Sequence, residues 1–276
     1  MKTIRARDNA FVKQLIALAH SSRERRKAGL TVLDGIHLVR AYLDAGEVPH
    51  ALAIAESALQ REEVAALLAR SPLPAVNLLA DALMAEASAL ESPAFVMAMV
   101  ATPATRPTPA DATVLVLEDV QDPGNVGSIL RSAAAAGVGE VALSKTTAFA
   151  WSPKVLRAGQ GAHFSLNIVE GVDVAAFIRG HSGHGGHGGK GGYGGQSLAL
   201  VAGGHGVRRL YDVDLLPPTA FLIGNEGAGL SADVRQAATC RVTIPMPGRA
   251  ESLNAAAAAA VCLFEMVRQR TVHKKR

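Results

Sequence analysis

Short apolar runs alternate with amphipathic helical patterns along most of this chain. In the second half, the pattern predicts a strand, a loop, a helix and two further strands, at 113–118, 119–127, 128–136, 140–144 and 219–223. A long alanine-rich helix is predicted from about residue 252. Strands that alternate with helices are typical of an α/β fold with a mostly parallel sheet.

The first hundred residues repeat this alternation on a smaller scale. Phe11, Leu15 and Leu18 share one face of a helical segment that we expect to end near Gly29. The segments that follow predict strands at 30–33, 51–55 and 76–79, and helices at 36–43, 62–68 and 81–89. A second, smaller and mostly parallel sheet is therefore expected here.

A proline-rich stretch separates the two halves. Residues 102–111 contain Pro103, Pro107 and Pro109 and few apolar side chains, as a linker does. We therefore predict an N-terminal α/β domain at 1–102, a linker at 103–112 and a C-terminal α/β domain at 113–276. Sites in parallel sheets lie at the carboxyl ends of strands, where the glycine-rich loops of the second domain fall.

Residues 180–195 form a glycine- and histidine-rich insert. They hold ten of the chain's 27 glycines and almost no apolar side chain, so we expect a flexible loop. His181, His184 and His187 are candidate metal ligands. Because glycine-rich backbone does not preorganise a site, we favour the flexible loop and predict no metal.

The composition excludes several classes of protein. With 49% hydrophobic and 19% charged residues the chain is not intrinsically disordered. No apolar run reaches the roughly 18 residues that span a bilayer, and the first residues do not resemble a signal peptide. The two cysteines, Cys240 and Cys262, are too few for a disulfide framework or a cysteine-based zinc site. We therefore expect a soluble, cytoplasmic protein.

Positive charge gathers at the two ends of the chain. Residues 1–30 carry eight basic and two acidic side chains, and residues 266–276 carry five basic side chains and no acidic one. The net charge of the whole chain is only +4, so the residues between are acidic on balance. This distribution suits contact with phosphate groups and equally suits solvated tails. Among the candidate phosphate contacts are Arg23, Arg25, Arg26 and Lys27.

Three loop-containing motifs carry candidate chemistry. The first, Asn125-Val-Gly-Ser-Ile-Leu-Arg131, enters a helix, where free backbone N–H groups suit an anion or a ribose hydroxyl. We expect Arg131 to reach back over the loop that holds Asn125. An exposed arginine beside a structural asparagine turn explains this motif equally well on its own.

The second motif, Ile223-Gly-Asn-Glu-Gly-Ala-Gly-Leu-Ser231, follows an apolar strand. Its glycines, Gly224 among them, allow the main chain to approach a ligand closely, and Glu226 is the acidic residue of the loop. The spacing matches neither the Rossmann fingerprint nor a P-loop. An unrelated nucleotide-binding enzyme would need such a phosphate loop.

The third motif, Ile244-Pro-Met-Pro-Gly-Arg-Ala-Glu-Ser-Leu-Asn254, leaves a strand and enters the final helix. Ser252 and Asn254 lie near the first turn of that helix, so Ser252 is a candidate for chemistry or merely a helix cap. No single motif of the three decides between a functional and a structural role.

In order and spacing, the three motifs together resemble the signature of the SpoU branch of SPOUT methyltransferases. These enzymes methylate ribose 2′-hydroxyls of RNA with S-adenosylmethionine. The resemblance covers about residues 113–270. Residues 1–102 look like the N-terminal RNA-binding domain of many members, mainly through Val32-Leu-Asp-Gly-Ile-His-Leu-Val39.

The resemblance implies a C-terminal trefoil-knotted domain and a homodimer with the active site at or beside the interface. It implies that S-adenosylmethionine is held by backbone near the residues Gly224, Ile244, Met246 and Leu253. Its catalytic set corresponds to Arg131, Asn125, Glu226, Ser252 and Asn254. Family mechanisms give the residue at 131 the role of general base. Because a guanidinium normally stays protonated in proteins, we expect Arg131 to bind phosphate and stabilise the forming alkoxide instead.

The expected function is therefore methylation of RNA ribose, with ribosomal RNA favoured over transfer RNA. A non-catalytic RNA-binding or assembly factor of the same fold is one alternative, and methylation of a base is another. All of these depend on one spatial expectation: the three motifs converge on a single pocket.

Overall fold

The computed structural model describes residues 1–70, 73, 75–89, 94–109, 111–181 and 195–273. The chain forms two compact units. The first consists of Met1–Ala104 and Phe149–Ser165, and the second of Thr105–Ala148 and Leu166–Arg276. The predicted division did not anticipate the return of residues 149–165 to the N-terminal unit, because their sequence carries no signal for which sheet they contact.

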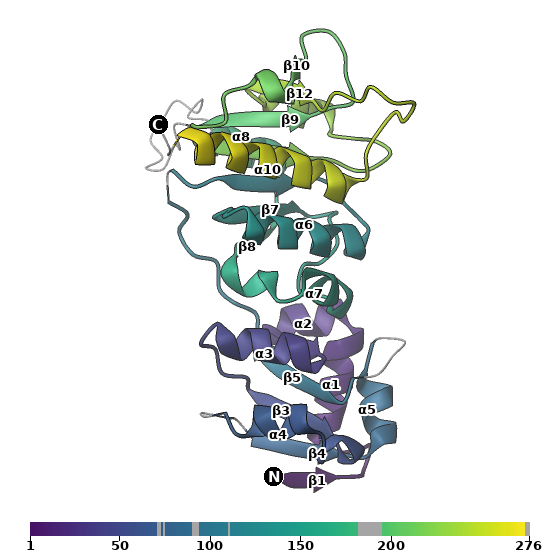
Figure 1. Cartoon of the computed structure of the whole chain (residues 1–276). Coiled ribbons are helices and arrows are strands. Elements are labelled where there is room, and N and C mark those ends of the chain that lie inside the picture. Colours follow the sequence, from purple (N-terminus) through teal and green to yellow (C-terminus); the bar gives the residue numbers. More distant parts are fainter. Residues whose placement is uncertain (71–72, 74, 90–93, 110, 182–194, 274–276) are drawn as a thin grey trace. The chain divides into compact units, whose positions relative to one another are not determined.

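The second unit is built on a sheet of seven parallel strands (Figure 1), which confirms the predicted α/β fold. Their order across the sheet is β10-β12-β9-β11-β6-β7-β8. The strands are β6 (Val114–Leu117), β7 (Glu140–Ser144), β8 (Asn167–Val172), β9 (Gln196–Leu200), β10 (Arg208–Arg209), β11 (Thr219–Ile223) and β12 (Cys240–Thr243).

The strand order reverses direction beside β6. The chain runs outward from β6 through β7 to β8 and then returns to build β9, β11 and β12 on the other side. Ligands of such sheets bind at the carboxyl ends of strands beside the reversal. The segments that follow β6, β11 and β12 carry the three sequence motifs, so this topology brings them to one edge.

Helices cover both faces of this sheet. On one face, α8 (Val174–His181) and α9 (Ala232–Ala237) pack on a core that includes Val116, Ala199 and Leu222. On the other, α10 (Ala255–His273) packs against α6 (Pro123–Ala135) through mostly small side chains. The buried positions of α10 are Ala255, Ala258, Ala259, Cys262, Leu263, Glu265 and Met266.

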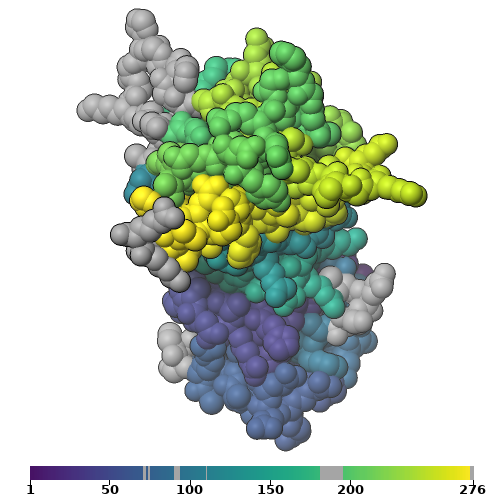
Figure 2. Space-filling view, turned by 45° about the horizontal axis from the view of Figure 1, so that its top comes forward, coloured from purple at the N-terminus to yellow at the C-terminus, as the bar shows by residue number. Residues whose placement is uncertain are grey.

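The end of α10 is bonded to the segment before β11. Gln269 accepts from the backbone N–H of Leu215 at 2.9 Å and donates to the carbonyl of Val213 at 3.1 Å. Arg270 donates to the carbonyls of Leu215 and Pro217 and to the hydroxyl of Thr113. Burial lowers the pKa of the Arg270 guanidinium. The other side of α10 stays on the surface, where its yellow stretch is visible in the space-filling view (Figure 2).

The first unit has a five-stranded sheet of order β1-β4-β3-β5-β2. Strands β1, β4 and β3 are parallel, whereas β5 is antiparallel to both β3 and β2. Strand β2 therefore runs in the same direction as β3, and the expectation of a mostly parallel sheet fails only at β5, because the alternation of apolar runs does not encode the end from which a strand enters a sheet. The strands are β1 (Lys2–Ile4), β2 (Leu30–Asp34), β3 (Ala51–Ala55), β4 (Ala75–Leu79) and β5 (Val96–Ala101).

The predicted N-terminal helix is two helices, α1 (Ala10–His20) and α2 (Ser22–Ala28). The break lies at Ser21, whose hydroxyl accepts from the backbone N–H of Glu24 at 3.2 Å and so caps α2. Ser21 and Glu24 have the spacing of a capping box, which was the available sequence signal. The remaining helices of this unit are α3 (Ile36–Asp44), α4 (Glu62–Leu68), α5 (Asp81–Ala87) and α7 (Pro153–Gly159).

Residues 149–165 join the first unit through specific contacts. The Thr31 hydroxyl donates to the carbonyl of Trp151 at 2.7 Å, and the guanidinium of Arg26 lies 4.2 Å from the centre of the Phe149 ring. His163 is almost completely buried, and its Nε2 lies 2.9 Å from the carbonyl of Ala150. Its Nδ1 has no hydrogen-bond partner within the described part of the chain. No helix of the described chain is long and apolar enough to cross a membrane.

Burial of His163 predicts a dependence of stability on pH. Desolvation lowers the pKa of this imidazole to about 4 in the folded state, against roughly 6.5 in an unfolded chain. The unfolded state therefore binds a proton first, and stability is lost as the pH falls from about 6.5 to 4. We expect His163→Gln, which can still donate to Ala150, to remove about 3 kcal/mol of this loss.

Urea unfolding at several pH values, followed by the fluorescence of the single tryptophan, Trp151, measures this effect. The exposed His37 gives the matched control, since His37→Gln should leave the pH dependence unchanged. Equal pH dependence in the wild-type protein and His163→Gln would contradict the assignment.

Candidate active site

Three segments far apart in the sequence are joined by side-chain hydrogen bonds at the carboxyl edge of the parallel sheet. The Asn254 amide donates to Asn125 Oδ1 at 2.9 Å, and the Asn125 amide in turn donates to Glu226 Oε1. Asn125 lies on α6 after β6, Glu226 follows β11, and Asn254 precedes α10. The structure thus brings together one residue from each motif.

Helix α6 begins five residues earlier than predicted, at Pro123 rather than 128. Asp122 caps it, accepting from the backbone N–H of Asn125 at 2.7 Å, and proline occupies the first turn. An acidic cap followed by proline is a helix-start signal that the sequence reading missed. Asn125 therefore lies in the first turn of a helix, and its side chain is held at the edge of the sheet.

Helix α10 begins at Ala255 rather than near 252, and Asn254 caps it. Asn254 Oδ1 accepts from the backbone N–H groups of Ala256 at 2.9 Å and Ala257 at 3.4 Å. Ser252 is exposed and is not this cap. The Asn254 side-chain oxygen thus caps α10, while its amide nitrogen donates a hydrogen bond to Asn125.

The loop after β11 folds tightly on itself. A Cβ atom on Gly224 would lie 2.4 Å from the carbonyl carbon of Gly229 and 2.5 Å from the nitrogen of Leu230, so only glycine fits. Asn225 Oδ1 accepts from the backbone N–H groups of Gly227 and Ala228, both at 2.9 Å. These contacts fix the backbone that carries Glu226.

Three further hydrogen bonds tie this loop to the segment after β6. The Asn225 amide donates to the carbonyl of Asp119 at 3.0 Å, and the Glu118 carboxylate accepts from the backbone and hydroxyl of Ser231 at 2.8 and 2.7 Å. Asp119 has a positive φ of 57°, a backbone conformation that residues other than glycine rarely adopt. The sequence reading missed Glu118, Asp119 and Asn225, although a carboxylate at the end of a buried strand was an available signal.

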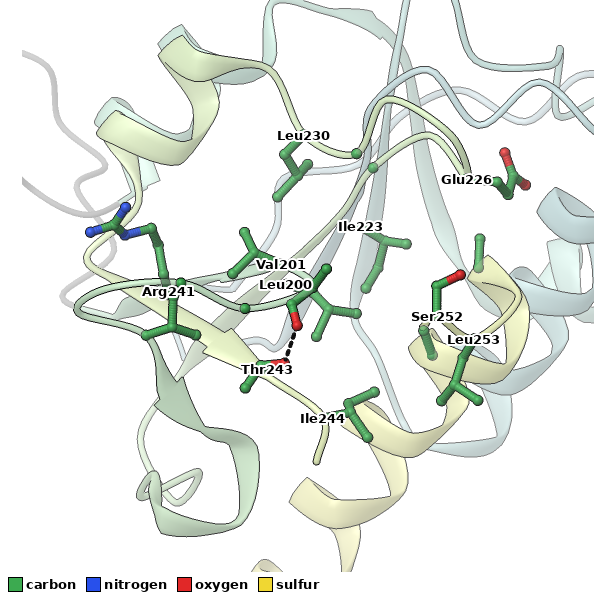
Figure 3. Close-up of a pocket in the computed structure, with 18 of the residues that line it drawn as sticks. Leu200, Val201, Ile223, Glu226, Leu230, Arg241, Thr243, Ile244, Ser252 and Leu253 are labelled. Atoms are coloured by element: carbon green, nitrogen blue, oxygen red, sulfur yellow. Dashed lines mark hydrogen bonds between the residues drawn. The ribbon is translucent and has the colours of Figure 1, made fainter. Parts of the chain in front are cut away.

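A cavity of about 600 Å³ opens beside this loop (Figure 3). Gly224, Ile244, Met246 and Leu253 all line it, as predicted for the cofactor residues, and so do Glu226 and Ser252. Another part of its wall is formed by the end of β9 and the segment that follows it, residues 200–205 and Val207, together with Arg235 and Arg241. The sequence reading missed this wall because the segment has no motif.

Arg131 does not join the hydrogen-bonded set. It is exposed, it does not line the cavity, and its guanidinium makes no hydrogen bond or ion pair with any described residue. With α6 starting at Pro123, Arg131 lies more than two turns into the helix and about 120° around its axis from Asn125. The expected reach of Arg131 over Asn125 is not formed within one chain.

The basic residues of α2 divide into two groups. Arg23, Arg26 and Lys27 are exposed, whereas Arg25 is buried and donates to the carbonyls of Leu18 and Ala19 at the end of α1. Burial lowers the pKa of Arg25. The expectation that Arg25 contacts RNA conflicts with this geometry, because its guanidinium is already used to hold two helices together.

Among the described residues no group of histidine, cysteine and acidic side chains has the arrangement of a metal site. Most of the glycine- and histidine-rich insert, including His184 and His187, lies outside the described residues. Its predicted flexible loop and candidate metal ligands therefore stay predictions.

Comparison with known proteins agrees with this geometry. Residues 112–264 match the SpoU rRNA Methylase family, and residues 9–98 match the MRM3-like substrate binding domain. The chain is 30% identical to the 23S rRNA (guanosine(2553)-2′-O)-methyltransferase RlmP of Bacillus subtilis, over 96% of this chain and 99% of that protein. It is 31% identical to a 23S rRNA (uridine(2479)-2′-O)-methyltransferase of Streptomyces viridochromogenes, over 95% and 91% of the two chains.

A solved structure gives the same result for the fold. The SpoU methyltransferase AviRb of Streptomyces viridochromogenes, solved in complex with AdoMet, superposes with a TM-score of 0.82 at 31% identity. The match covers 95% of this chain and 98% of that one. The resemblance seen in the three motifs is confirmed, and the chain belongs to the SpoU rRNA methylase family.

Proposed function

We propose that this protein transfers a methyl group from S-adenosylmethionine to a ribose 2′-hydroxyl of ribosomal RNA. The observation that carries the proposal is the hydrogen-bonded series Asn254–Asn125–Glu226 at the rim of the cavity. The relatives named above act on 23S rRNA, one at a guanosine and one at a uridine. We therefore propose ribosomal RNA in the cytoplasm as substrate, without assigning the base.

The cavity fits S-adenosylmethionine in size and lining. Its volume is within the roughly 300–1,000 Å³ of small-molecule sites. Ile223, Ile244 and Leu253 offer apolar surface for an adenine ring, while the backbone around Gly224 and Met246 offers hydrogen-bonding groups. When bound, the cofactor supplies a methyl group activated by the adjacent sulfonium.

The protein's own residues would then position the ribose. Glu226 and Ser252 face the cavity rim, and Asn125 holds one carboxylate oxygen of Glu226, which fixes that side chain. The second oxygen is available to a ribose hydroxyl or a guanidinium. Holding the reacting oxygen in line accounts for much of the barrier reduction in such a displacement.

We propose that Arg131 acts in a homodimer, in which it reaches the rim of the partner subunit's cavity. Support comes from exposure: Glu226, Ser252, Asn254 and Arg131 all face solvent in a single chain. Leu253, next to Asn254, and Phe264, on α10, also expose 39% and 48% of their surface. A symmetric contact through this side of α10 would bury them.

We further propose that the C-terminal segment is knotted. The chain leaves β12, which lies next to β9 in the sheet, and then returns toward β6. There it forms α10, which packs on α6. The segment 213–217 is bonded across the end of α10. A trefoil knot requires the end of the chain to pass through a loop of earlier residues, and these bonds place 213–217 next to the end of α10.

In the N-terminal unit, we propose that Arg23, Arg26 and Lys27 contact RNA phosphates. They are exposed on one short helix and lie within the segment that matches a substrate binding domain. Such contacts position RNA without reading its sequence.

The first test is direct. Purified protein incubated with unmodified ribosomal RNA and methyl-labelled S-adenosylmethionine should label the RNA, and the labelled linkage should resist alkali because a 2′-O-methyl group blocks cleavage. Transfer RNA is the parallel substrate. Label in a base, label in transfer RNA alone, or no label would each reject the proposal, and the last would favour a non-catalytic RNA-binding factor.

Arg131→Ala should lower methyl transfer at least about 100-fold, because it removes a cation that stabilises developing charge. The affinity for S-adenosylmethionine and the thermal stability should stay near the wild-type values, since Arg131 is exposed and has no described partner. Calorimetry and a methyl-transfer assay measure the two effects. Near-native turnover would remove Arg131 from the mechanism.

Mixing subunits tests the dimer. If Arg131 serves the partner's cavity, an inactive Arg131→Ala protein mixed with an inactive Asn254→Ala protein regains about a quarter of wild-type activity through random pairing. No recovery after complete subunit exchange would place Arg131 in the cavity of its own chain.

Gly224→Ala should weaken cofactor binding at least about tenfold and lower the free energy of unfolding by about 1–3 kcal/mol, because the added methyl displaces the loop at Gly229. Gly227→Ala is the matched control, since its Cβ would meet only Asn225 Oδ1 at an ordinary 3.6 Å. Titration calorimetry compares the two variants. Equal affinities would show that the cavity does not depend on this close approach.

A further inference from the structure

A second concavity, of about 680 Å³, lies between β10, α9 and β12 of the C-terminal unit. Three arginines line it, one from each element: Arg208, Arg235 and Arg241. We call it the arginine cleft. None of its described lining residues is acidic; the others are Gly206, Ala232, Gln236, Ala238, Thr239 and Cys240.

The charges of this cleft are not neutralised within the described chain. The guanidinium groups of Arg235 and Arg241 make no hydrogen bond or ion pair with a described residue, and Arg208 only donates to the backbone carbonyl of Asp212 at 2.9 Å. All three side chains are exposed. Residues 31–265 carry a net charge of −7. The three unpaired arginines of the cleft therefore form a positive site in a part of the chain that is acidic on balance.

The cleft is continuous with the cavity described above. Arg235 and Arg241 line both, and Gly206, at the edge of the cleft, follows the cavity wall formed by residues 200–205. Figure 3 shows Arg241 at the opposite end of the cavity from Glu226 and Ser252. A Cβ on Gly206 would lie 3.3 Å from Arg241 Nη2, so the glycine leaves this guanidinium room to move.

We infer that the arginine cleft binds phosphate groups of the RNA backbone, next to the cavity. Guanidinium groups pair with phosphate oxygens through two parallel hydrogen bonds, and three of them suit a polyanion better than a single small anion. The carboxylate of the cofactor is a less suitable ligand, because Arg208, Gln236 and Thr239 do not line the cavity. This inference rests on the proposed function and adds a contact surface for its substrate.

The test measures how RNA affinity depends on salt in the full chain. Each lost phosphate contact lowers the slope of log affinity against log salt by about 0.7–0.9. For in vitro transcribed large-subunit ribosomal RNA, the triple variant Arg208→Gln, Arg235→Gln, Arg241→Gln should lose about 2–3 from this slope and bind at least about tenfold more weakly near 0.1 M salt. Arg208 lines the cleft but not the cavity, so Arg208→Gln alone should change the affinity for S-adenosylmethionine less than about twofold.

Two control proteins isolate the cleft. Arg209 neighbours Arg208 on β10 but does not line the cleft, and its Nε lies 3.9 Å from the Asp212 carboxylate. Arg209→Gln should therefore change the salt slope by less than about half the amount expected for one phosphate contact. The triple substitution of the same arginines by lysine keeps the charge and should keep the slope, with a modest loss of affinity because the guanidinium fork is gone.

If the triple glutamine variant keeps the wild-type salt slope, the inference is overturned. If that variant keeps the wild-type salt slope but binds S-adenosylmethionine about tenfold more weakly, the arginines bind the cofactor carboxylate instead. The same loss of slope in Arg209→Gln would show a general charge effect instead of a site. Because salt-dependent binding is measured without methyl transfer, a protein that binds through the cleft but does not methylate RNA rejects only the proposed function.

Discussion

The hydrogen bonds among Asn125, Glu226 and Asn254 are the interaction on which the site depends. They join residues separated by 101 and 129 positions in the sequence, and each member is also fixed by its own backbone. Asn125 lies in the first turn of α6, Asn254 caps α10, and Glu226 lies in a loop held closed by Asn225. A change in any one element would therefore misplace the other two, which makes the rim a single unit.

The close approach at Gly224 serves the same end. It lets the loop after β11 fold back within van der Waals distance of itself, so that backbone, rather than side chains, forms part of the cavity wall. Backbone N–H and carbonyl groups hold their positions better than long side chains do, because they have little rotational freedom to lose. On the other face of this loop, Glu118 binds Ser231, so the loop is fixed from both sides.

The sequence was sufficient for the parts of the structure that are encoded locally. Apolar runs located β2, β3, β6, β7 and β11 within about a residue. The family resemblance carried by the three motifs implied four cofactor residues, and all four line the cavity. What failed depends on contacts between distant segments. The antiparallel β5, the return of 149–165 to the first unit and the burial of Arg25 have no local signature. The start of α6 is different, because the Asp122 cap followed by Pro123 is itself a local signal for the beginning of a helix.

The arginines of this chain fall into two groups, those bonded to other groups of the protein and those without a described partner. Arg25 and Arg270 are bonded to backbone carbonyls, and Arg268 is bonded to Glu265, which holds the pKa of that carboxyl below its usual range. A buried or paired guanidinium of this kind donates to groups within the fold and is not available to a ligand. Arg131, Arg235 and Arg241, by contrast, have no described partner for their donors, and all three belong to the unit that contains the cavity. Because these exposed guanidinium groups donate only to solvent, they can bind an anion without breaking a contact of the fold. These unpaired guanidinium groups support the two proposals made above, that the arginine cleft binds RNA phosphates and that Arg131 serves the cavity of a second subunit.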